Sequence, residues 1–255
     1  MIYQINHATS IEVVRQKKGM RMSKVLIIVT NHTKFDNSKA APTGLWLSEL
    51  THFYDVFEAA GIAMDIVSPK GGRIHVDGRS LGFFVMDKAT KKRRQDPAFM
   101  TLLENTKSIS DVNWATYDVV YFAGGHGAMW DFAENSELHA KTADFYEGGK
   151  VVSAVCHGVA ALQEVLLSDG TYLIDGKRGT GFSYFDEGIA GVKRLVPYNM
   201  EQRLKDRGLQ YSKAMIPLAQ HTVVDERLIT GQNPNSATVT AERTLEEMKR
   251  VASGT

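Results

Sequence analysis

The sequence contains a single cysteine, Cys156, among 255 residues. One thiol excludes an internal disulfide framework, and it also excludes zinc or iron–sulfur sites built from several cysteines. A chain of this length buries a core large enough to fold without such staples. The lone cysteine is therefore either a small buried apolar side chain or a reactive thiol, and its surroundings in the sequence have to decide between the two.

A surplus of one charge sign is also missing. Lys and Arg together number 30, Asp and Glu together number 29, and the formal net charge is +1. Nucleic-acid binders and polybasic membrane anchors both need an excess of cations, so neither nucleic acid nor a membrane is expected as a partner. No apolar run is long enough to cross a membrane, and residues 1–22 lack the apolar core of a signal peptide. These features predict a cytoplasmic protein.

Signals for a cofactor or a metal are scarce as well. The glycine-rich segment at residues 124–127 is too short for a dinucleotide-binding fingerprint and lacks the downstream acidic partner. Most of the histidines show no ligand-like spacing; these are His7, His32, His75, His139 and His221. We therefore expect no organic cofactor and no metal.

The hydrophobic pattern predicts an α/β fold. A continuous β-branched run at residues 24–30 is typical of a strand buried on both faces, and a loop, a helix at 45–61 and a second strand at 63–68 follow it. This order is the unit of a doubly wound, mostly parallel sheet sandwiched by helices. Further strands are predicted at 117–123, 150–155 and 228–231, and further helices at 134–147, 196–207 and 242–251.

One domain is expected from residue 23 to residue 255, because neither a linker nor an internal repeat interrupts the pattern. Residues 71–116 are less regular, and we expect a small inserted cap with short helices near an edge of the sheet. Residues 1–22 are expected to form a loose N-terminal arm.

The cysteine lies where an apolar strand turns into a helix. Ala154 and Gly158 flank Cys156 and His157 in the small-x-nucleophile-x-Gly arrangement of a nucleophile elbow, with cysteine in the place of the nucleophile. A strained turn of this kind lifts the side chain out of the sheet at its carboxyl edge. The N–H groups and dipole of the following helix are expected to lower the pKa of the thiol. The alternative is a buried structural cysteine, but the elbow favours a functional thiol.

Two further features point to the same edge. Gly124 and Gly125 directly follow a predicted strand, where glycines let backbone N–H groups approach a substrate as an oxyanion hole requires; a tight turn without a ligand is the alternative. Glu49 lies in the first helix. If its side chain faces solvent it has no special role, whereas burial against the sulfur would raise its pKa and allow it to donate a hydrogen bond or shuttle a proton.

Taken together, these motifs resemble the ThiJ/PfpI superfamily within the class I glutamine amidotransferase-like fold, and favour its branch of heat-shock chaperones and glutathione-independent glyoxalases. The resemblance covers about residues 23–249. The segments that carry it are residues 25–30, 43–50 (TGLWLSEL), 57–61 (FEAAG), 65–68, 123–127 (AGGHG), 154–158 (AVCHG), 180–182 with Glu187, and 227–236.

The resemblance implies a flavodoxin-like fold that usually forms a homodimer. It implies Cys156 as nucleophile, His157 as its acid/base partner and Glu49 as the carboxyl group that contacts the sulfur. The backbone N–H groups of Gly125 and His157 would form the oxyanion pocket, in a substrate-binding segment that also includes Gly124 and His126. Glu187 would orient the histidine as the third member of a triad, with its neighbour Asp186 as the alternative. Phe57 replaces a metal-binding histidine of some chaperone members, so no metal site is carried over.

Three functions are compatible with this site. The first is a glutathione-independent glyoxalase of the D-lactate dehydratase type, which converts the dicarbonyl methylglyoxal to lactate through a cysteine hemithioacetal. The second is a stress-response chaperone for unfolded client proteins, or a redox sensor whose cysteine is oxidised without turnover. The third is a cysteine amidase or peptidase. The first is preferred because Glu49 is expected beside Cys156.

Overall fold

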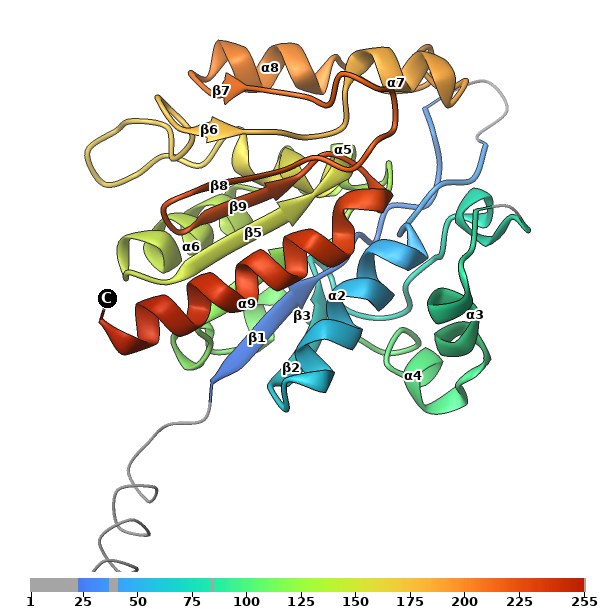
Figure 1. The fold of residues 1–255 in the computed structure, drawn as a ribbon, viewed down its shortest axis with the longest axis horizontal. Coiled ribbons are helices and arrows are strands. Elements are labelled where there is room, and N and C mark those ends of the chain that lie inside the picture. The colour runs from blue at the N-terminus through green and yellow to red at the C-terminus, as the bar shows by residue number, and fades with distance from the viewer. Residues whose placement is uncertain (1–22, 37–40, 84, 255) are drawn as a thin grey trace, which may run out of the picture.

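A seven-stranded sheet forms the centre of the computed structural model, which describes residues 23–36, 41–83 and 85–254. The strand order is β3-β2-β1-β4-β5-β9-β8, and all neighbours are parallel except β8 and β9 (Figure 1). The predicted mostly parallel sheet is therefore present, and the expected arm at residues 1–22 lies outside the described part. The strands are β1 (Lys24–Ile28), β2 (Ala63–Ser68), β3 (Lys107–Ser108), β4 (Val119–Phe122), β5 (Val151–Val155), β8 (Thr222–Asp225) and β9 (Leu228–Gly231).

Helices cover both faces of the sheet. In the view of Figure 1, α2 (Leu47–Ala59) and α9 (Ala237–Ser253) pack against each other in front of it, and α6 (Ser136–Glu147) lies behind it. No helix within the described residues is long and apolar enough to span a membrane. The remaining elements are α3 (Lys88–Gln95), α4 (Pro97–Thr101), α5 (Ala128–Asp131), α7 (Tyr184–Ile189), α8 (Met200–Asp206), the 3-10 helices η1 (Gly78–Leu81), η2 (Ile109–Asp111), η3 (Trp114–Thr116), η4 (Cys156–Leu162) and η5 (Pro234–Ser236), and the short paired strands β6 (Arg178–Gly179) and β7 (Gln210–Tyr211).

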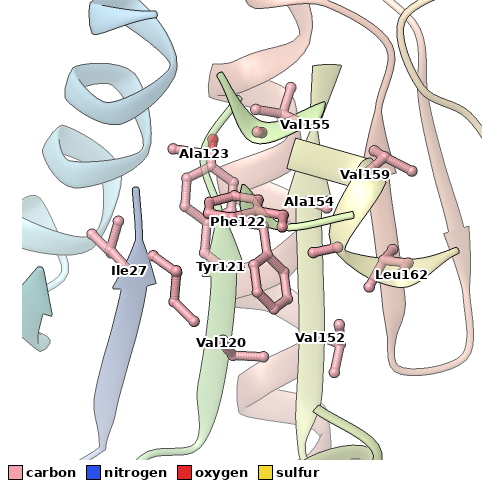
Figure 2. Packing of buried hydrophobic residues seen from close by; sticks show 14 of the residues in the cluster. Ile27, Val120, Tyr121, Phe122, Ala123, Val152, Ala154, Val155, Val159 and Leu162 are labelled. Carbon is pink, nitrogen blue, oxygen red and sulfur yellow. The ribbon is translucent and has the colours of Figure 1, made fainter. Parts of the chain in front are cut away.

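The core forms around the central strands β1, β4 and β5. Every residue of β4 and β5 is buried, as expected for parallel strands covered on both faces. Figure 2 shows the apolar side chains of these strands, among them Ile27, Phe122 and Val152, together with Val159 and Leu162 of η4. The segment after Cys156 is thus anchored in the same core as the strands that precede it.

Two helices start four or five residues away from their predicted starts. The helix predicted at 196–207 begins only at Met200, because the side chain of Asn199 accepts a hydrogen bond from the N–H of Gln202 and caps it there. The last helix starts at Ala237 rather than at residue 242. Its first turns are held by buried threonines instead of large apolar side chains, and Thr244 donates to the hydroxyl of Ser153 in β5 at 2.8 Å. Small polar residues of this kind leave no apolar periodicity in the sequence.

Residues 71–116 contain the short helices α3 and α4, and they also supply β3, which extends the sheet beyond β2. The helix α3 is fastened to α2 by Arg93, which donates to Asp55 at 2.6 Å and pairs with Glu58. Just before η1, Val76 bridges Leu45, and Arg79 of η1 lies 3.1 Å from His126, which follows β4, so part of the region reaches the carboxyl edge of the sheet.

The chain changes direction across the sheet at β1. From β1 the chain first adds β2 on one side and later adds β4 and β5 on the other. Open α/β sheets bind ligands at the carboxyl ends of strands next to such a switch point. In this protein those ends lead into Gly124 after β4 and into Cys156 after β5.

Candidate active site

The turn after β5 has the strained geometry that the sequence predicts. Val155 is extended, whereas Cys156 has a φ of +55°, a left-handed conformation that is uncommon for a residue other than glycine. Gly158 is needed to close this turn, because a Cβ atom there would lie 2.9 Å from the carbonyl carbon of Phe122 in β4. The helix that follows is a 3-10 helix rather than an α-helix. The turn holds the thiol at the carboxyl edge of the sheet.

The side chain of Cys156 contacts the ring of the next residue. Its Sγ lies 3.2 Å from Nδ1 of His157, and Nε2 of His157 lies 2.7 Å from Oε1 of Glu187. A carboxylate only accepts hydrogen bonds, so Nε2 of His157 carries the proton and Nδ1 is free to accept from the thiol. The order thiol, imidazole, carboxylate is that of a nucleophile, a base and a group that orients the base.

The carboxylate comes from α7, a short helix whose first turn is capped by the Ser183 hydroxyl, which accepts from the N–H of Asp186 at 3.0 Å. The cap fixes the start of the helix, and from there the side chains of Asp186 and Glu187 point in different directions. Glu187 reaches the histidine, whereas Asp186 accepts from the side-chain amide of Gln232 at 2.9 Å. Of the two carboxylates that the sequence left open, the structure therefore places Glu187 on His157.

The pKa of Glu187 shows how tightly this carboxylate is held. Burial alone would raise it, but the rings of His157 and His126 lower the pKa to about 2. Glu187 therefore remains an anion throughout the physiological range. An anion in this position stabilises a positive charge on His157.

His126 is the second ring bound by Glu187. Its Nε2 lies 3.0 Å from Oε2 of Glu187, its Nδ1 lies 3.1 Å from Nη2 of Arg79, and its ring centroid is 4.0 Å from that of His157. Burial, followed by the proximity of His157, lowers the pKa of His126 to about 4. The sequence placed His126 among the substrate-binding groups. Because both ring nitrogens are engaged here, the ring belongs to the network behind His157, and any contact with substrate would fall to its backbone.

Glu49 is fully buried and lies against the thiol. A Cβ atom on Gly124 would overlap Oε2 of Glu49 and would lie 3.0 Å from Cβ of Cys156, so only glycine fits where the carboxyl and the cysteine meet. The hydroxyl of Tyr121 donates to the backbone carbonyl of Glu49 at 2.8 Å and fixes this part of α2. The carboxyl group thus faces the sulfur and not the solvent, which is the condition that the sequence left open.

The pKa of Glu49 follows from this burial. Neither carboxyl oxygen has a hydrogen-bond partner of good geometry among the described residues, and desolvation raises the pKa to about 8. The Cys156 thiol and the Gly124 N–H face the carboxyl and limit the rise. At pH 7 the group is mainly neutral and can donate a hydrogen bond.

The pKa of the Cys156 thiol corrects one expectation. The start of a helix was expected to lower it, but burial and the adjacent Glu49 raise it well above its ordinary value, and the N–H of His157 opposes this only in part. The start of η4, a 3-10 helix of seven residues, therefore does not outweigh the burial of the sulfur. The resting site therefore holds a thiol, and its activation requires a base.

The glycine pair after β4 adopts a conformation suited to close approach. Gly125 has a φ of +106°, and a Cβ atom there would lie 2.9 Å from the backbone carbon of Leu45. The carbonyl of Gly124 accepts from the N–H of Trp46 at 3.1 Å, which ties the pair to the segment that leads into α2. The oxyanion role of the Gly125 and His157 N–H groups stays a prediction.

Sequence reasoning missed Arg79 and its partner Asp77. Asp77 is buried; it accepts from Nε of Arg79 at 2.9 Å and from the hydroxyl of Thr43 at 3.0 Å. Although burial would raise the pKa of Asp77, Arg79 holds it below its usual value. Both residues lie in the irregular segment 71–116, where no periodicity links them to the sheet edge. The Asp-Gly-Arg sequence at residues 77–79 is the signal that the sequence offers.

His126, His157 and Glu187 also form a donor set that zinc accepts, since one ligand atom from each lies within 4.8 Å of the others. In this structure those atoms are hydrogen-bonded to one another, and the guanidinium of Arg79 adds positive charge next to His126. The fixed positive charge of Arg79 opposes the binding of a metal cation at short range. The arrangement suits a hydrogen-bonded relay better than a metal centre.

Comparisons with known proteins agree on one family. The sequence profile of the DJ-1/PfpI family matches residues 41–247. The chain is 31% identical to the glutathione-independent glyoxalase HSP31 of Saccharomyces cerevisiae, over 90% of this chain and 100% of that protein. It resembles the crystal structure of glyoxalase III from Candida albicans with a TM-score of 0.81 at 31% identity, covering 90% and 98% of the two chains. It resembles the Rapid Encystment Protein of 24 kDa from Francisella tularensis with a TM-score of 0.84 at 40% identity, covering 89% and 99%.

Proposed function

This chain belongs to the DJ-1/PfpI family and is a homologue of its glutathione-independent glyoxalases, and we propose that it converts methylglyoxal and water to lactate without glutathione. One observation carries the proposal. The thiol of Cys156 lies between a base that can take its proton, His157, and a buried carboxyl group that stays neutral at pH 7, Glu49.

The first step is activation of the thiol. His157 Nδ1 takes the proton of Cys156, and the resulting imidazolium is stabilised by the anion of Glu187 behind it. The sulfur then attacks the aldehyde carbon, forming a C–S bond while the electron pair of the C=O bond moves to oxygen. His157 returns the proton to that oxygen, which gives a neutral hemithioacetal. The N–H groups of Gly125 and His157 are the donors that we assign to the oxygen while it is charged.

The second step moves hydrogen from one carbon to its neighbour. Neutral His157 removes the proton from the former aldehyde carbon, and the electron pair passes to the adjacent ketone, whose oxygen receives a hydrogen bond from Glu49. Glu49 passes its proton to that oxygen, and His157 returns its proton to the former ketone carbon. The hydroxyl on the carbon bound to sulfur gives its proton to Glu49, which leaves the lactate thioester of Cys156. Water then attacks the thioester carbonyl and releases lactate, and the sulfur regains its proton. The sum is one dicarbonyl plus one water for one hydroxy acid.

The limited access to the Cys156 thiol supports a small substrate. Only 3% of Cys156 is exposed, and Glu49 and His157 are fully buried. A short dicarbonyl needs little space beside the sulfur. An extended peptide would need a groove that leads to Cys156.

The assay that tests this function follows methylglyoxal loss and lactate gain with reduced protein and no glutathione. Wild type is expected to form lactate, and Cys156→Ala is expected to form none. Glu49→Gln is expected to be strongly impaired, whereas Glu58→Gln, at the exposed end of the same helix, should match wild type. Full turnover by both Cys156→Ala and Glu49→Gln would refute the mechanism, and absence of turnover in well-folded wild type would refute the function.

A further inference from the structure

His126 has a different kind of partner on each ring nitrogen. Arg79 Nη2 lies 3.1 Å from Nδ1, and Glu187 Oε2 lies 3.0 Å from Nε2. A guanidinium only donates hydrogen bonds and a carboxylate only accepts them. Nδ1 must therefore be the acceptor and Nε2 must carry the proton. This pair of contacts fits one neutral tautomer and does not fit the doubly protonated ring.

Arg79 is itself held firmly in place. Its Nε donates to the buried Asp77 at 2.9 Å, its Nη2 also reaches Asp77, and the guanidinium carbon lies 5.0 Å from the centre of the Phe35 ring. About one third of the side chain is exposed, at 34%, so the charge is fixed at the border between the solvent and the buried cluster. An arginine anchored in this way presents a constant donor to His126.

We propose that Arg79 is a positioning residue that fixes His126 in its Nε2–H form and adds to the burial that keeps the ring neutral, and thereby reserves the negative charge of Glu187 for His157. Three charged or titratable groups face the His126 ring, each from a different element: Arg79 from η1, His157 from η4 and Glu187 from α7. Apolar rings of Phe35 and Phe182 complete its surroundings. Asp77 lies behind Arg79 and fixes the direction of its donors.

The consequence concerns His157. If His126 took a proton, two imidazolium rings with centroids 4.0 Å apart would compete for one carboxylate. The affinity of His157 for the thiol proton would then fall. By opposing that proton in addition to burial, Arg79 favours His157 as the ring of this pair that accepts it. The effect on turnover rests on the proposed function, whereas the protonation of His126 does not.

The first test reads the histidine ring directly, by NMR of protein labelled with nitrogen-15 histidine between pH 5 and pH 8. The His126 signals are assigned from their loss in His126→Asn. In wild type we expect an Nε2–H ring that stays neutral over this range. In Arg79→Met we expect the ring to take up a proton at a higher pH than in wild type. Arg73→Met is the control, since Arg73 is 76% exposed and pairs with Glu104.

The second test measures kcat/KM for methylglyoxal against pH. Protonated His126 would weaken His157 mainly at low pH, so the ratio of wild type to Arg79→Met is expected to be about tenfold larger at pH 6 than at pH 8. Arg79→Lys keeps a charge and a donor, and it is expected to restore much of the wild-type profile. A merely structural loss would lower the rate equally at both pH values.

These outcomes separate the two proposals. A neutral His126 in wild type that titrates at a higher pH in Arg79→Met supports the role of Arg79 even if no dicarbonyl is turned over. A His126 ring that is protonated at Nδ1 in wild type at pH 7 overturns it, whatever the variants do. Parallel titration and pH profiles in wild type and a folded Arg79→Met protein would overturn it as well.

Discussion

The Nδ1 atom of His157 lies 3.2 Å from the Sγ atom of Cys156, although the two residues are neighbours in the sequence. Adjacent side chains on a strand or a regular helix point away from each other. Here the left-handed backbone at Cys156 turns the thiol back toward the following ring. Two consecutive positions can therefore supply the thiol and its base. The carboxylate that orients the base, Glu187, comes from α7.

Removing the charge of Glu187 should lower the rate without unfolding the protein. Glu187→Gln keeps a side chain of the same shape but cannot stabilise the His157 imidazolium, so kcat should fall by about 10²-fold or more. Asp186→Asn is the matched control, because Asp186 contacts Gln232 instead, and its kcat should stay within a few-fold of wild type. Equal losses in the two variants would show that the contact with His157 is not what matters. Steady-state kinetics with a melting curve for each variant makes the comparison.

The activity should decline as the pH rises through about 8. The pKa of Glu49 is raised to about 8 by burial, so the carboxyl is neutral below this pH and anionic above it. An anion beside the sulfur opposes the thiolate and can no longer donate a hydrogen bond. In Glu49→Gln the rate should be lower throughout, but the decline near pH 8 should be absent. A basic limb that persists in this variant would assign it to another group; a pH profile of kcat/KM decides.

The same carboxyl should reduce stability at alkaline pH. Its pKa in the folded protein lies above the ordinary value of 4.5, so the folded state holds a proton that the unfolded state releases, and stability falls as the pH rises from about 4.5 to about 8. The shift corresponds to at most about 5 kcal/mol. Glu49→Gln removes this cost, so it should gain stability relative to wild type at pH 8 compared with pH 5. Urea unfolding at both pH values measures the difference, and a constant difference would contradict the burial argument.

Gly158 should tolerate no side chain. A Cβ atom there would press against the carbonyl group of Phe122, and moving either backbone would shift the turn that holds Cys156. Gly158→Ala should cost about 1–3 kcal/mol of unfolding free energy and most of the activity. Gly82→Ala is a suitable control, since Gly82 has an ordinary φ of −61° and only normal contacts around its Cβ position. Equal stability of the two variants would contradict the packing argument.

The sequence predicts the parts of this protein that depend on local pattern. Buried parallel strands form continuous apolar runs, so the strand that ends before Cys156 and the elbow after it could be located from residue types alone. The sequence could not decide whether Glu49 is buried or faces solvent, because the side of α2 on which a polar residue lies depends on the strands packed beneath it. The choice between Glu187 and Asp186 depended on the cap at Ser183, which fixes the rotation of a short helix.

The position of Arg79 at the site could not be predicted from the sequence, for a different reason. Its segment lies far from Cys156 in the chain and has no regular periodicity, so only the folded structure brings η1 against His126. The raised pKa of the thiol could not be foreseen either, because it depends on how completely the cysteine and Glu49 exclude water. The homodimer and the binding of unfolded client proteins concern other molecules, and they stay predictions.

The central claim is that lactate forms through a covalent bond to Cys156. Rapid-quench mass spectrometry of the reduced protein with methylglyoxal tests it most directly, because the chain has a single cysteine on which an adduct can be located. We predict an adduct of one methylglyoxal on Cys156 that appears before lactate, decays at the rate of lactate release, and is absent from Cys156→Ala. Lactate formed at the full rate without any adduct on Cys156, or formed by Cys156→Ala, would contradict the account.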